Sequence, residues 1–468
     1  MKTSTVPSAW FEEEGFRLDT KPYTSGAVQT KTLLRRLRTQ PLRSLTAGFN
    51  GGIYTPPIHN FSRNYVEDPE HGVPFVGSTT MLRSDLNGLP LLSKRDAFSP
   101  KLMPLRLETG MTLVSASGTI GRTAYVRRDM DGIWSSGDVM KVRPDPDKVP
   151  SGFLYAYLSC RFGVPLLVAG TYGTIIQHIE APHLAEIPVP RFGESMERKT
   201  DGLMKKSAEA RARANDLLDL AQTSLKETLG LTPLRQRFAL PKPLTATPNA
   251  SVIAGRMDAQ YFIAFNEDAR CGFDAAAVDE RPRLGDVADV RIPGIFKRRF
   301  VEGPSLGVPY VTGGDVFQLV PESNQFLARA VAAEYELIVR EGMILIQEAG
   351  QLGGLIGRCM MVGAHLDGFA CSNNMVRVTS NDPKDAGYLF AVLSSDHGWR
   401  LLSRESAGSS IPHIDCGRVR NVRIPWASAP DRARVGEMVA EAIELRDQAR
   451  RSETEARSIV ERAIQGEP

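Results

Sequence analysis

The residue types that perform catalysis are scattered along this chain, and their spacing matches no constellation that would do chemistry. The seven histidines do not pair with the five cysteines in a zinc-binding spacing. A Gly-x-x-x-x-Gly-Lys-Ser/Thr phosphate loop and the Asn/Asp-Pro-Pro-aromatic quartet of amino-methyltransferases are both absent. Asp145, Asp147 and Lys148 lie between prolines, which favours a turn over a nuclease site. We therefore expect no catalytic residue, no metal and no cofactor on this chain.

The pattern that dominates the sequence is an internal repeat. Gly110–Arg122 reads as a buried strand, a glycine-bearing loop and a second strand, and Gly342–Arg358 repeats it after a slightly longer loop. Other matched motifs follow in the same order, and the matched histidines His178 and His413 are 235 positions apart by subtraction. Because chance matches would not keep one order and one offset, we interpret the two halves as copies of one folding unit.

Each copy mixes short strands with one or two helices, which indicates an α+β unit. In the first copy the clearest helix covers about residues 151–162, after the start signal Pro150-Ser151. A long helix follows each copy, because residues 194–229 and 430–465 carry apolar seams at heptad spacing between faces of mixed charge. We expect these helices to pack on each other antiparallel. The predicted seam residues are Leu203, Ala210, Ala214, Leu217, Ala221, Met438, Ala442, Leu445, Ala449, Ala456 and Ile459.

The predicted fold class is therefore α+β, with two repeated units separated by a pair of long antiparallel coiled-coil helices. Residues 1–192 form the first unit, and residues 193–230 form the central helix. A proline-rich linker at 231–250 leads to the second unit at 251–428, and the C-terminal helix covers 429–468.

Composition bounds the class of protein. A hydrophobic content of 42% and a charged content of 24% are ordinary for a globular chain of 468 residues, which is long enough for two or three domains. The net charge of +3 permits a nucleic-acid partner without requiring one, so any basic surface must be local. Dispersed cysteines favour reduced thiols and a cytoplasmic location. No signal peptide or apolar run of about 20 residues is present, so we expect no membrane partner.

The order of unit, helix, unit and helix closely resembles the DNA-specificity (S) subunit of type I restriction–modification systems. The resemblance covers nearly the whole chain, from about Arg17 to Ile464. Arg17-Leu18-Asp19 and Arg256-Met257-Asp258, each followed by a Tyr, resemble the start of a target-recognition domain in that family. Ile187-Pro188-Val189-Pro190 resembles the family's start of a long helix, although the acidic-Gln pair that usually follows is absent. That departure leaves the type of partner system open.

The resemblance implies a non-catalytic protein. Each α+β unit would be a target-recognition domain that reads one half of a split site in double-stranded DNA. The long helices would set the spacing of the two halves and dock DNA methyltransferase subunits, with a restriction or translocase subunit as an optional further partner. S-adenosylmethionine would then be bound by the partner methyltransferase, in a restriction–modification or related phage-defence complex.

The candidate DNA-contacting residues lie on expected loops of the two units. Lysine and arginine contacts to phosphates position a protein on DNA, whereas contacts to base edges specify the sequence. Residues that differ between the copies should carry sequence choice, and asparagine can bond adenine through two hydrogen bonds. The predicted DNA-binding residues are Lys94, Arg95, Lys101, Arg106, Arg122, Thr171, Thr174, Lys297, Arg298, Arg299, Arg358, Asn373, Asn374, Ser409 and Ser410.

Two other classes of function remain open from the sequence. The chain could be a protein–protein scaffold of a defence complex whose basic loops are incidental, or an enzyme with an unrecognised site such as a fused nuclease. Salt-dependent binding to duplex DNA would separate the first reading from a scaffold, and DNA cleavage by the purified chain with a metal ion would support the enzyme.

Overall fold

The computed structural model describes residues 5–13, 16–18, 20–55, 63–118, 120–172, 177–236, 239–240, 243–253, 255–323, 325–408 and 410–467. The chain divides into two compact units. Unit 1 comprises Met1–Ala212 and Gln448–Pro468, and unit 2 comprises Arg213–Asp447. Each unit contains an α+β globule and one part of each long helix. The predicted α+β fold with long helices is confirmed.

Unit 1 contains two four-stranded sheets. The first has the strand order β2 (Ile53–Tyr54), β9 (Val139–Val142), β6 (Thr112–Ser115), β7 (Thr123–Tyr125), and all its pairs are antiparallel. The second has the order β3 (Tyr65–Val66), β5 (Leu91–Ser93), β4 (Gly72–Val76), β8 (Trp134–Ser135), and β4 and β8 are parallel. The central strands β6 and β9 are buried along their whole length, including the polar residues Thr112, Ser115 and Lys141. The Nζ of Lys141 donates to the carbonyls of Ser136 and Val139, which satisfies it inside the fold.

Unit 2 has the same strand orders. Its sheets are β11 (Ala288–Arg291), β18 (Met375–Ser380), β15 (Ile344–Gln347), β16 (Cys359–Met361), and β12 (Phe300–Val301), β14 (Phe326–Ala328), β13 (Gly307–Val311), β17 (Ala370–Cys371). The register is also the same, since Thr112 lies opposite Val142 in unit 1 and Ile344 lies opposite Val378 in unit 2. The sequence motifs matched across the repeat therefore occupy matched places in the two units.

Two consecutive helices follow the first sheet in each unit, and the first helix of each pair packs on that sheet. In unit 1 these are α5 (Ser151–Ser159) and α6 (Gly163–Ala169), and in unit 2 they are α15 (Ala386–Ser394) and α16 (Asp396–Arg404). The prediction of one helix over about residues 151–162 was wrong at its end. Cys160 adopts an extended conformation with ψ 170°, which ends α5, and Gly163 then starts α6 against the backbone of Tyr157.

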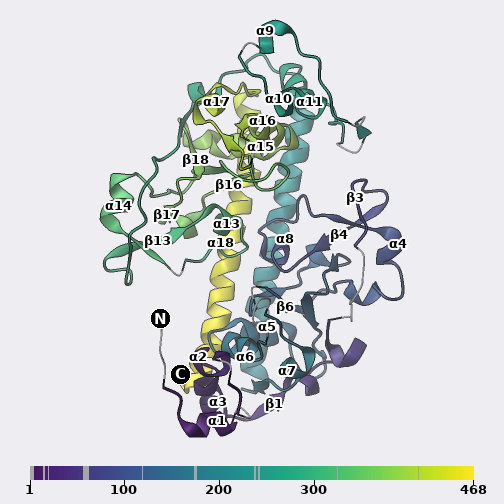
Figure 1. The fold of residues 1–468 in the computed structure, drawn as a ribbon, viewed down its shortest axis with the longest axis vertical. Helices are drawn as coiled ribbons and strands as arrows, with labels where there is room; N and C mark the ends of the chain where they lie inside the picture. Colours follow the sequence, from purple (N-terminus) through teal and green to yellow (C-terminus); the bar gives the residue numbers. More distant parts are fainter. Residues whose placement is uncertain are drawn as a thin grey trace. The chain divides into compact units, whose positions relative to one another are not determined.

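The two long helices are α8 (Glu194–Leu229) and α18 (Ala429–Gln465), drawn in teal and yellow in Figure 1. Gly230, in the left-handed region at φ 61°, ends α8 as a glycine C-cap. Within unit 2 the helices run antiparallel, because Arg434 contacts Thr228 at 2.8 Å while Arg446 contacts Asn215 at 3.2 Å. Within unit 1, Arg211 of α8 pairs with Glu453 of α18.

Both long helices contribute to the core of each unit. In unit 1, Ala456, Val460 and Ile464 of α18 share one apolar cluster with Phe153 of α5 and Met204 of α8. In unit 2 the corresponding cluster contains Ala221, Leu225 and Leu229 of α8 with Val435 and Val439 of α18. Five of the predicted seam residues are fully buried: Ala214, Ala221, Ala442, Ala449 and Ala456. The other six are partly exposed: Leu203, Ala210, Leu217, Met438, Leu445 and Ile459.

The remaining elements are short. In unit 1 they are α1 (Ser8–Glu13), α2 (Lys21–Thr24), α3 (Ala27–Leu34), β1 (Thr39–Pro41), α4 (Lys94–Ala97), α7 (Ala181–Ala185) and β10 (Pro188–Pro190). In unit 2 they are α9 (Ala250–Ile253), α10 (Ala259–Phe262), α11 (Ala264–Asp274), α12 (Leu284–Val287), α13 (Gly313–Val316), α14 (Arg329–Glu334), β19 (Ser406–Ala407), β20 (His413–Ile414) and α17 (Cys416–Asn421).

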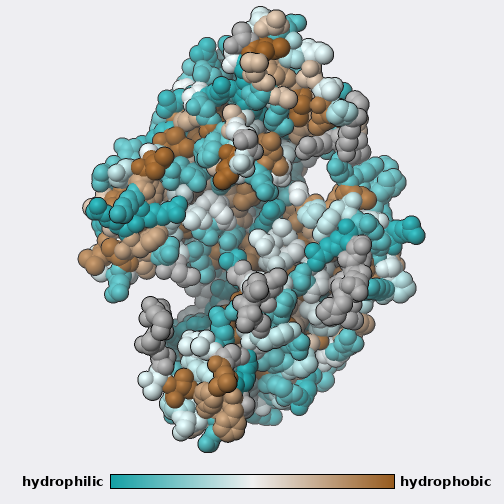
Figure 2. Space-filling model, viewed as in Figure 1, coloured by the Kyte–Doolittle hydropathy of each residue, from teal (hydrophilic) through white to brown (hydrophobic). Residues whose placement is uncertain are grey.

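The surface is mixed in polarity. On the face shown in Figure 2, hydrophobic residues form separate small groups among hydrophilic ones. Among the described residues, no single helix is long and apolar enough to cross a membrane. The helices α5 and α6 would reach that length only together, and they are bent by 69° at the break between them.

Candidate nucleic-acid interface

The arginine that opens each repeat holds the backbone just before a loop. Arg17 donates to the carbonyls of Ala169 and Thr171, both at 3.0 Å. Arg256 makes the matched bonds in unit 2, to the carbonyls of Arg404 at 3.1 Å and Ser406 at 2.6 Å. We call each of these contacts an arginine clasp. Because charge-assisted hydrogen bonds are the stronger ones, each clasp fixes the start of the loop that follows.

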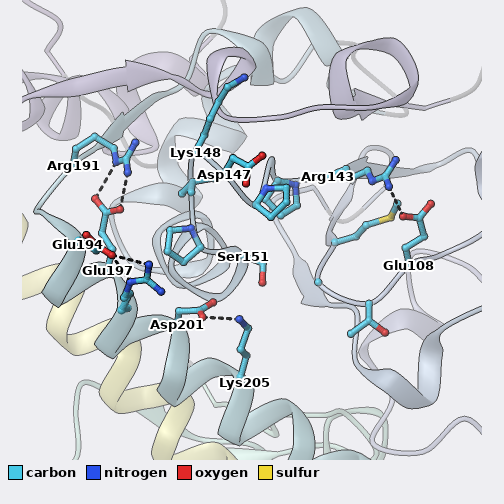
Figure 3. A pocket seen from close by; sticks show the side chains of 18 residues that line it. Glu108, Arg143, Asp147, Lys148, Ser151, Arg191, Glu194, Glu197, Asp201 and Lys205 are labelled. Carbon is cyan, nitrogen blue, oxygen red and sulfur yellow. Dashed lines mark hydrogen bonds and ion pairs between the residues drawn. The ribbon is translucent and has the colours of Figure 1, made fainter.

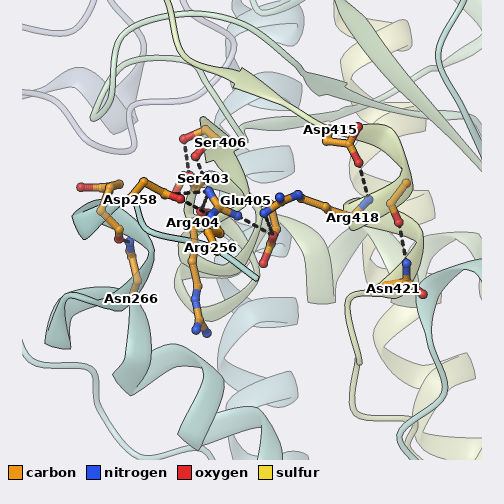
Figure 4. Close-up of polar contacts among 12 residues, drawn as sticks. Arg256, Asp258, Asn266, Ser403, Arg404, Glu405, Ser406, Asp415, Arg418 and Asn421 are labelled. Carbon is orange, nitrogen blue, oxygen red and sulfur yellow. Dashed lines mark hydrogen bonds and ion pairs between the residues drawn. The ribbon is translucent and has the colours of Figure 1, made fainter. Parts of the chain in front are cut away.

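The clasp of unit 2 is part of a dense ionic cluster, shown in Figure 4. Arg256 pairs with Asp258 at 2.9 Å and with Glu405 at 3.0 Å, and its guanidinium lies 4.3 Å from the ring centre of Tyr261. Burial raises the pKa of Glu405, and the charge of Arg256 opposes that rise. The cluster is internally paired, so the Arg-Met-Asp motif has a structural part in this unit. Asp19 of the matching motif lies outside the described residues.

Backbone hydrogen bonds join three segments into one edge of each globule. In unit 1 the amide of Ala116, after β6, donates to the carbonyl of Asp138 at 2.9 Å, and the amide of Ile179 donates to Ala116 at 3.0 Å. In unit 2 Glu348 donates to Asn374 at 3.0 Å, and Ile414 donates to Glu348 at 2.9 Å. We define this recognition edge as residues 115–118, 136–138, 172 and 177–179 in unit 1, and residues 347–350, 372–374, 407–408 and 410–414 in unit 2.

Several candidate residues meet at the recognition edge of unit 2. Asn374 and Ser410 are exposed there, and Asn373 is half-buried. His413 Nδ1 lies 2.8 Å from Glu348 Oε1, so the matched histidine is fixed by a carboxylate that sequence reasoning did not single out. Amide, hydroxyl, imidazole and carboxylate groups therefore share one surface that can both donate and accept hydrogen bonds.

Thr171 directly precedes the matching edge of unit 1, and this residue is buried. Its hydroxyl donates to the carbonyl of Val168 at 2.6 Å, which occupies the group within the fold. Tyr172 is exposed and pairs with His178 across the loop. The predicted contacts Thr174 of this loop and Ser409 of the matching loop lie outside the described residues.

Two polar residues at the edge of unit 1 were missed by sequence reasoning. Arg63 donates to Asp138 at 3.0 Å and to the hydroxyl of Ser136 at 3.1 Å. Burial raises the pKa of Asp138, but hydrogen bonds from Arg63 and Ser136 outweigh this and hold that pKa below its usual value. The repeat could have identified Asp138, because it directly precedes β9 just as the predicted contact Asn374 directly precedes the matched strand β18.

The first basic cluster lies around β5 and Trp134. Lys94 and Arg95 are exposed on α4, and Lys94 Nζ donates to the carbonyl of Glu70 at 2.8 Å. Lys101 is exposed, and the guanidinium of Arg106 lies 5.9 Å from the ring centre of Trp134. These four residues form a second surface of unit 1, suited to phosphates more than to base edges.

The other candidate cations have different surroundings. Lys297, Arg298 and Arg299 are exposed in the loop between β11 and β12. The matched arginines differ in exposure: Arg122 is exposed, whereas Arg358 stacks on Trp399 with 4.4 Å from guanidinium to ring centre. Arg358 therefore packs on an aromatic ring, whereas the matched Arg122 is exposed.

A groove of about 680 Å³ lies between the globule of unit 1 and α8, shown in Figure 3. Its cations pair with its own carboxylates, Arg143 with Glu108 at 2.9 Å and Lys205 with Asp201 at 2.7 Å. The corresponding groove of unit 2, about 510 Å³, is lined mainly by small residues such as Gly387, Gly436 and Ala440. Neither groove presents the unbalanced positive charge that a phosphate would need.

Metal binding and nucleophilic catalysis each require a specific arrangement of side chains. Among the described residues, no group of three or more His, Cys, Asp or Glu could hold a metal. All five cysteines are unpaired. Gly303-Pro304-Ser305-Leu306-Gly307 matches the Gly-x-Ser-x-Gly pattern, but Ser305 is exposed in a turn between the strands β12 and β13. A nucleophile elbow requires a strand followed by a helix, so this serine lacks the required setting.

Comparisons with known proteins give structural matches only. No family model matches the chain, and no curated protein matches it. The type I restriction–modification S subunit from M. genitalium is similar at 12% identity with a TM-score of 0.35, over 91% of this chain and 94% of that chain. The HsdS subunit from Thermoanaerobacter tengcongensis is similar at 16% identity with a TM-score of 0.28, over 92% and 97%.

A third match is a chain from a structure of the type I restriction–modification system described for its complex assembly and conformational transition. It is 17% identical with a TM-score of 0.29, over 91% of this chain and 97% of that chain. All three matches come from the protein family that the sequence resembles.

Proposed function

We propose that this chain is a non-catalytic DNA-specificity subunit that reads a split target and recruits methyltransferase subunits in a restriction–modification or related phage-defence complex. The observation that carries the proposal is the recognition edge. It is built twice from the same hydrogen bonds, Ala116 to Asp138 and Glu348 to Asn374, yet it bears different side chains in the two units. A duplicated frame with different surface groups suits one reader for each half of a target.

The chemistry of the edges suits base recognition. Asparagine can bond adenine, arginine can bond guanine, and a carboxylate can accept from cytosine. The exposed cations Lys297 and Arg299, with Lys94 and Arg95, would supply the phosphate contacts that give salt-dependent affinity. Each half-site would then be positioned by cations and specified by one edge.

The long helices would serve the partners. Each is a continuous helix of 36 or 37 residues, and about 1.5 Å of rise per residue makes such a helix roughly 50 Å long. In the proposal, their exposed charged faces dock methyltransferase subunits, and S-adenosylmethionine is bound by those subunits. A restriction or translocase subunit is an optional further partner.

A domain exchange tests the proposal. Residues 251–426 are replaced by the corresponding segment of a related specificity subunit, and the DNA bound by each full-length protein with its methyltransferase partner is sequenced. One half of the target should change while the other is kept. Changes in both halves would count against two independent readers.

Salt dependence separates DNA reading from a protein scaffold. Six or more phosphate contacts should lower the affinity for duplex DNA by orders of magnitude between low and moderate salt. Absence of DNA binding with the partner present would favour the scaffold.

A further inference from the structure

An arginine stacks on a matched aromatic ring in both units. The guanidinium of Arg63 lies 6.0 Å from the ring centre of Phe75, and that of Arg298 lies 5.8 Å from the ring centre of Tyr310. Phe75 and Tyr310 occupy the same register, opposite Trp134 in β8 and Ala370 in β17. The two arginines are therefore placed on the same point of the repeated frame, although the loops that carry them differ in sequence.

Asp138 and Asn374 also occupy one matched position, directly before β9 and β18. The segments that lead to these positions are anchored alike. The amide of Ser136, directly after β8, donates to the carbonyl of Val76 at 2.7 Å, and the amide of Ser372, directly after β17, donates to the carbonyl of Val311 at 3.0 Å. The carbonyls of Asp138 and Asn374 then accept from Ala116 and Glu348, the matched bonds of the recognition edge.

The side chains at these positions differ in one decisive way. In unit 1, Arg63 is held by the carboxylate of Asp138 at 3.0 Å. In unit 2, the matched residue is an exposed amide, and within the described residues the contact of Arg298 is the ring of Tyr310 rather than a carboxylate. Arg298 is exposed, so its N–H donors are available to a ligand, whereas Arg63 uses N–H donors to bond Asp138.

Resting on the proposed function, we propose that Arg63–Asp138 and Arg298–Asn374 are the matched base-contact pairs of the two half-sites, and that the residue at position 138 or 374 sets which base edge each unit reads. Unit 2 offers a guanidinium and an amide, which fit guanine O6/N7 and adenine N6/N7. In unit 1 the carboxylate of Asp138 accepts from Arg63, Ser136 and Ser117, and its remaining lone pair fits the amino group of cytosine.

Exchanging the two side chains tests this assignment with minimal change in size. Asn374→Asp gives unit 2 the carboxylate of unit 1, and Asp138→Asn releases Arg63. The full chain, with the methyltransferase subunit from the same genome, is incubated with a random duplex library, and the bound DNA is sequenced. Asp147→Asn is the matched control, because Asp147 is an exposed carboxylate of unit 1 outside the recognition edge.

The expected result is a change of base preference at one position in one half-site for each exchange. The preference should change on the order of tenfold to hundredfold, the range of a two-bond base contact. The other half-site and the Asp147→Asn control should match the wild type. Asn374→Ser, which removes the amide without adding charge, should lose preference at the same position as Asn374→Asp.

Two results would overturn the assignment in different ways. If the wild type enriches a split motif and the folded variants, checked by thermal unfolding, enrich the same motif, the base-contact pairs are wrong and the proposed function stands. If the wild type enriches no motif, the proposed function fails and the assignment fails with it.

Discussion

At one matched position, the junction between globule and long helices is charged in unit 1 and apolar in unit 2. In unit 1 the hydroxyl of Tyr155 donates to the buried Glu453 at 3.0 Å, and Arg211 and Arg457 pair with the same carboxylate. Glu453 is matched by Leu218 of unit 2 at the repeat offset, and Leu218 packs against the apolar core of that unit.

The frame around this difference is kept. Arg457 donates to the hydroxyl of Ser159 at 3.1 Å, and the matched Gln222 donates to that of Ser394 at 3.2 Å. The repeat therefore keeps the positions at which side chains of the helices and the globule meet, whereas the type of interaction at each position differs between the units. A fully paired buried charge and an apolar contact are interchangeable here only when the whole set of partners changes together.

The largest expected effect comes from breaking the polar junction. Glu453→Leu installs the residue of unit 2 but leaves Arg211, Arg457 and Tyr155 without their shared carboxylate. Loss of one partner of a buried ion pair costs about 3–5 kcal/mol, so the free energy of unfolding of unit 1 should fall by that amount. Guanidinium denaturation followed by two probes measures it.

A combined exchange sharpens this test. Tyr155→Phe, Arg211→Met and Arg457→Gln, added to Glu453→Leu, should recover most of the loss, because replacing a complete buried ionic set by apolar groups is often neutral. A single variant that loses less than about 1 kcal/mol would contradict the view that the charges depend on one another.

The next effect distinguishes the units by pH. His397 is buried and stacks on Phe273 with 5.5 Å between ring centres, and unit 1 has Phe162 at the matched position. Burial is the main reason that the pKa of His397 is lowered to about 4. The charges of Arg400 and Lys226 also lower it, and the charge of Asp396 opposes them. The unfolded chain binds the proton first as pH falls below about 6.5, so stability is lost between there and pH 4.

The expected loss over that window is about 3 kcal/mol, and roughly 2 kcal/mol of it should appear between pH 7.5 and pH 5. His397→Phe should abolish this part of the acid sensitivity, as measured by denaturation at the two pH values. Burial opposes the ionised form of Glu453, but the charges of Arg211 and Arg457 lower its pKa to about 2. Its contribution to stability is therefore lost mainly below about pH 4.5, and it adds little pH dependence between pH 7.5 and pH 5. An unchanged pH dependence would rule out His397 as the source.

A smaller effect comes from two matched glycines at the helix contacts. A Cβ at Gly387 would lie 2.5 Å from the carbonyl oxygen of Gly436, whereas a Cβ at Gly152 would lie 2.8 Å from the Cβ of Met204 and 3.0 Å from the Cα of Asp201. Gly387→Ala should cost about 2–3 kcal/mol and Gly152→Ala about 1–2 kcal/mol, because both sets of contacts are rigid but those at Gly387 are shorter and are all made by the backbone of Gly436. Thermal unfolding of both variants ranks them, and the reverse order would contradict the geometry.

The smallest effect belongs to an exposed pair in unit 2. Arg213 lies 2.8 Å from Glu441, and both side chains are about half exposed. Glu441→Gln should change stability by less than about 1 kcal/mol, and the change should shrink further in high salt. A loss of stability as large as that of Glu453→Leu would show that burial does not explain why the ion pairs of Glu453 contribute more than Arg213–Glu441.

The sequence predicted those features that repeat. Matched strand motifs and the heptad seams led to two α+β units and to long helices at 194–229 and 430–465, and the structure has helices at 194–229 and 429–465. The break after Ser159 was not predicted, because an apolar run through Cys160 and Phe162 continues the helical pattern while the local backbone does not.

The candidate site was less accessible from the sequence. Asn374 was singled out, but its matched Asp138 and the partner Arg63 were not, because the two contacting residues are 75 positions apart and lie in loops without periodicity. Thr171 has the residue type of a phosphate contact, yet its hydroxyl is used within the fold. Such outcomes depend on which groups the folded chain brings together, and no local pattern encodes them.

The makeup of unit 1 has a consequence for synthesis on the ribosome. Its core includes Ala456, Val460 and Ile464, which are translated after all of unit 2. During synthesis, part of the apolar core of the first globule therefore stays exposed to solvent until the last helix has been translated. Nascent chains halted before residue 448 would be the natural clients of chaperones and the easiest targets of proteases.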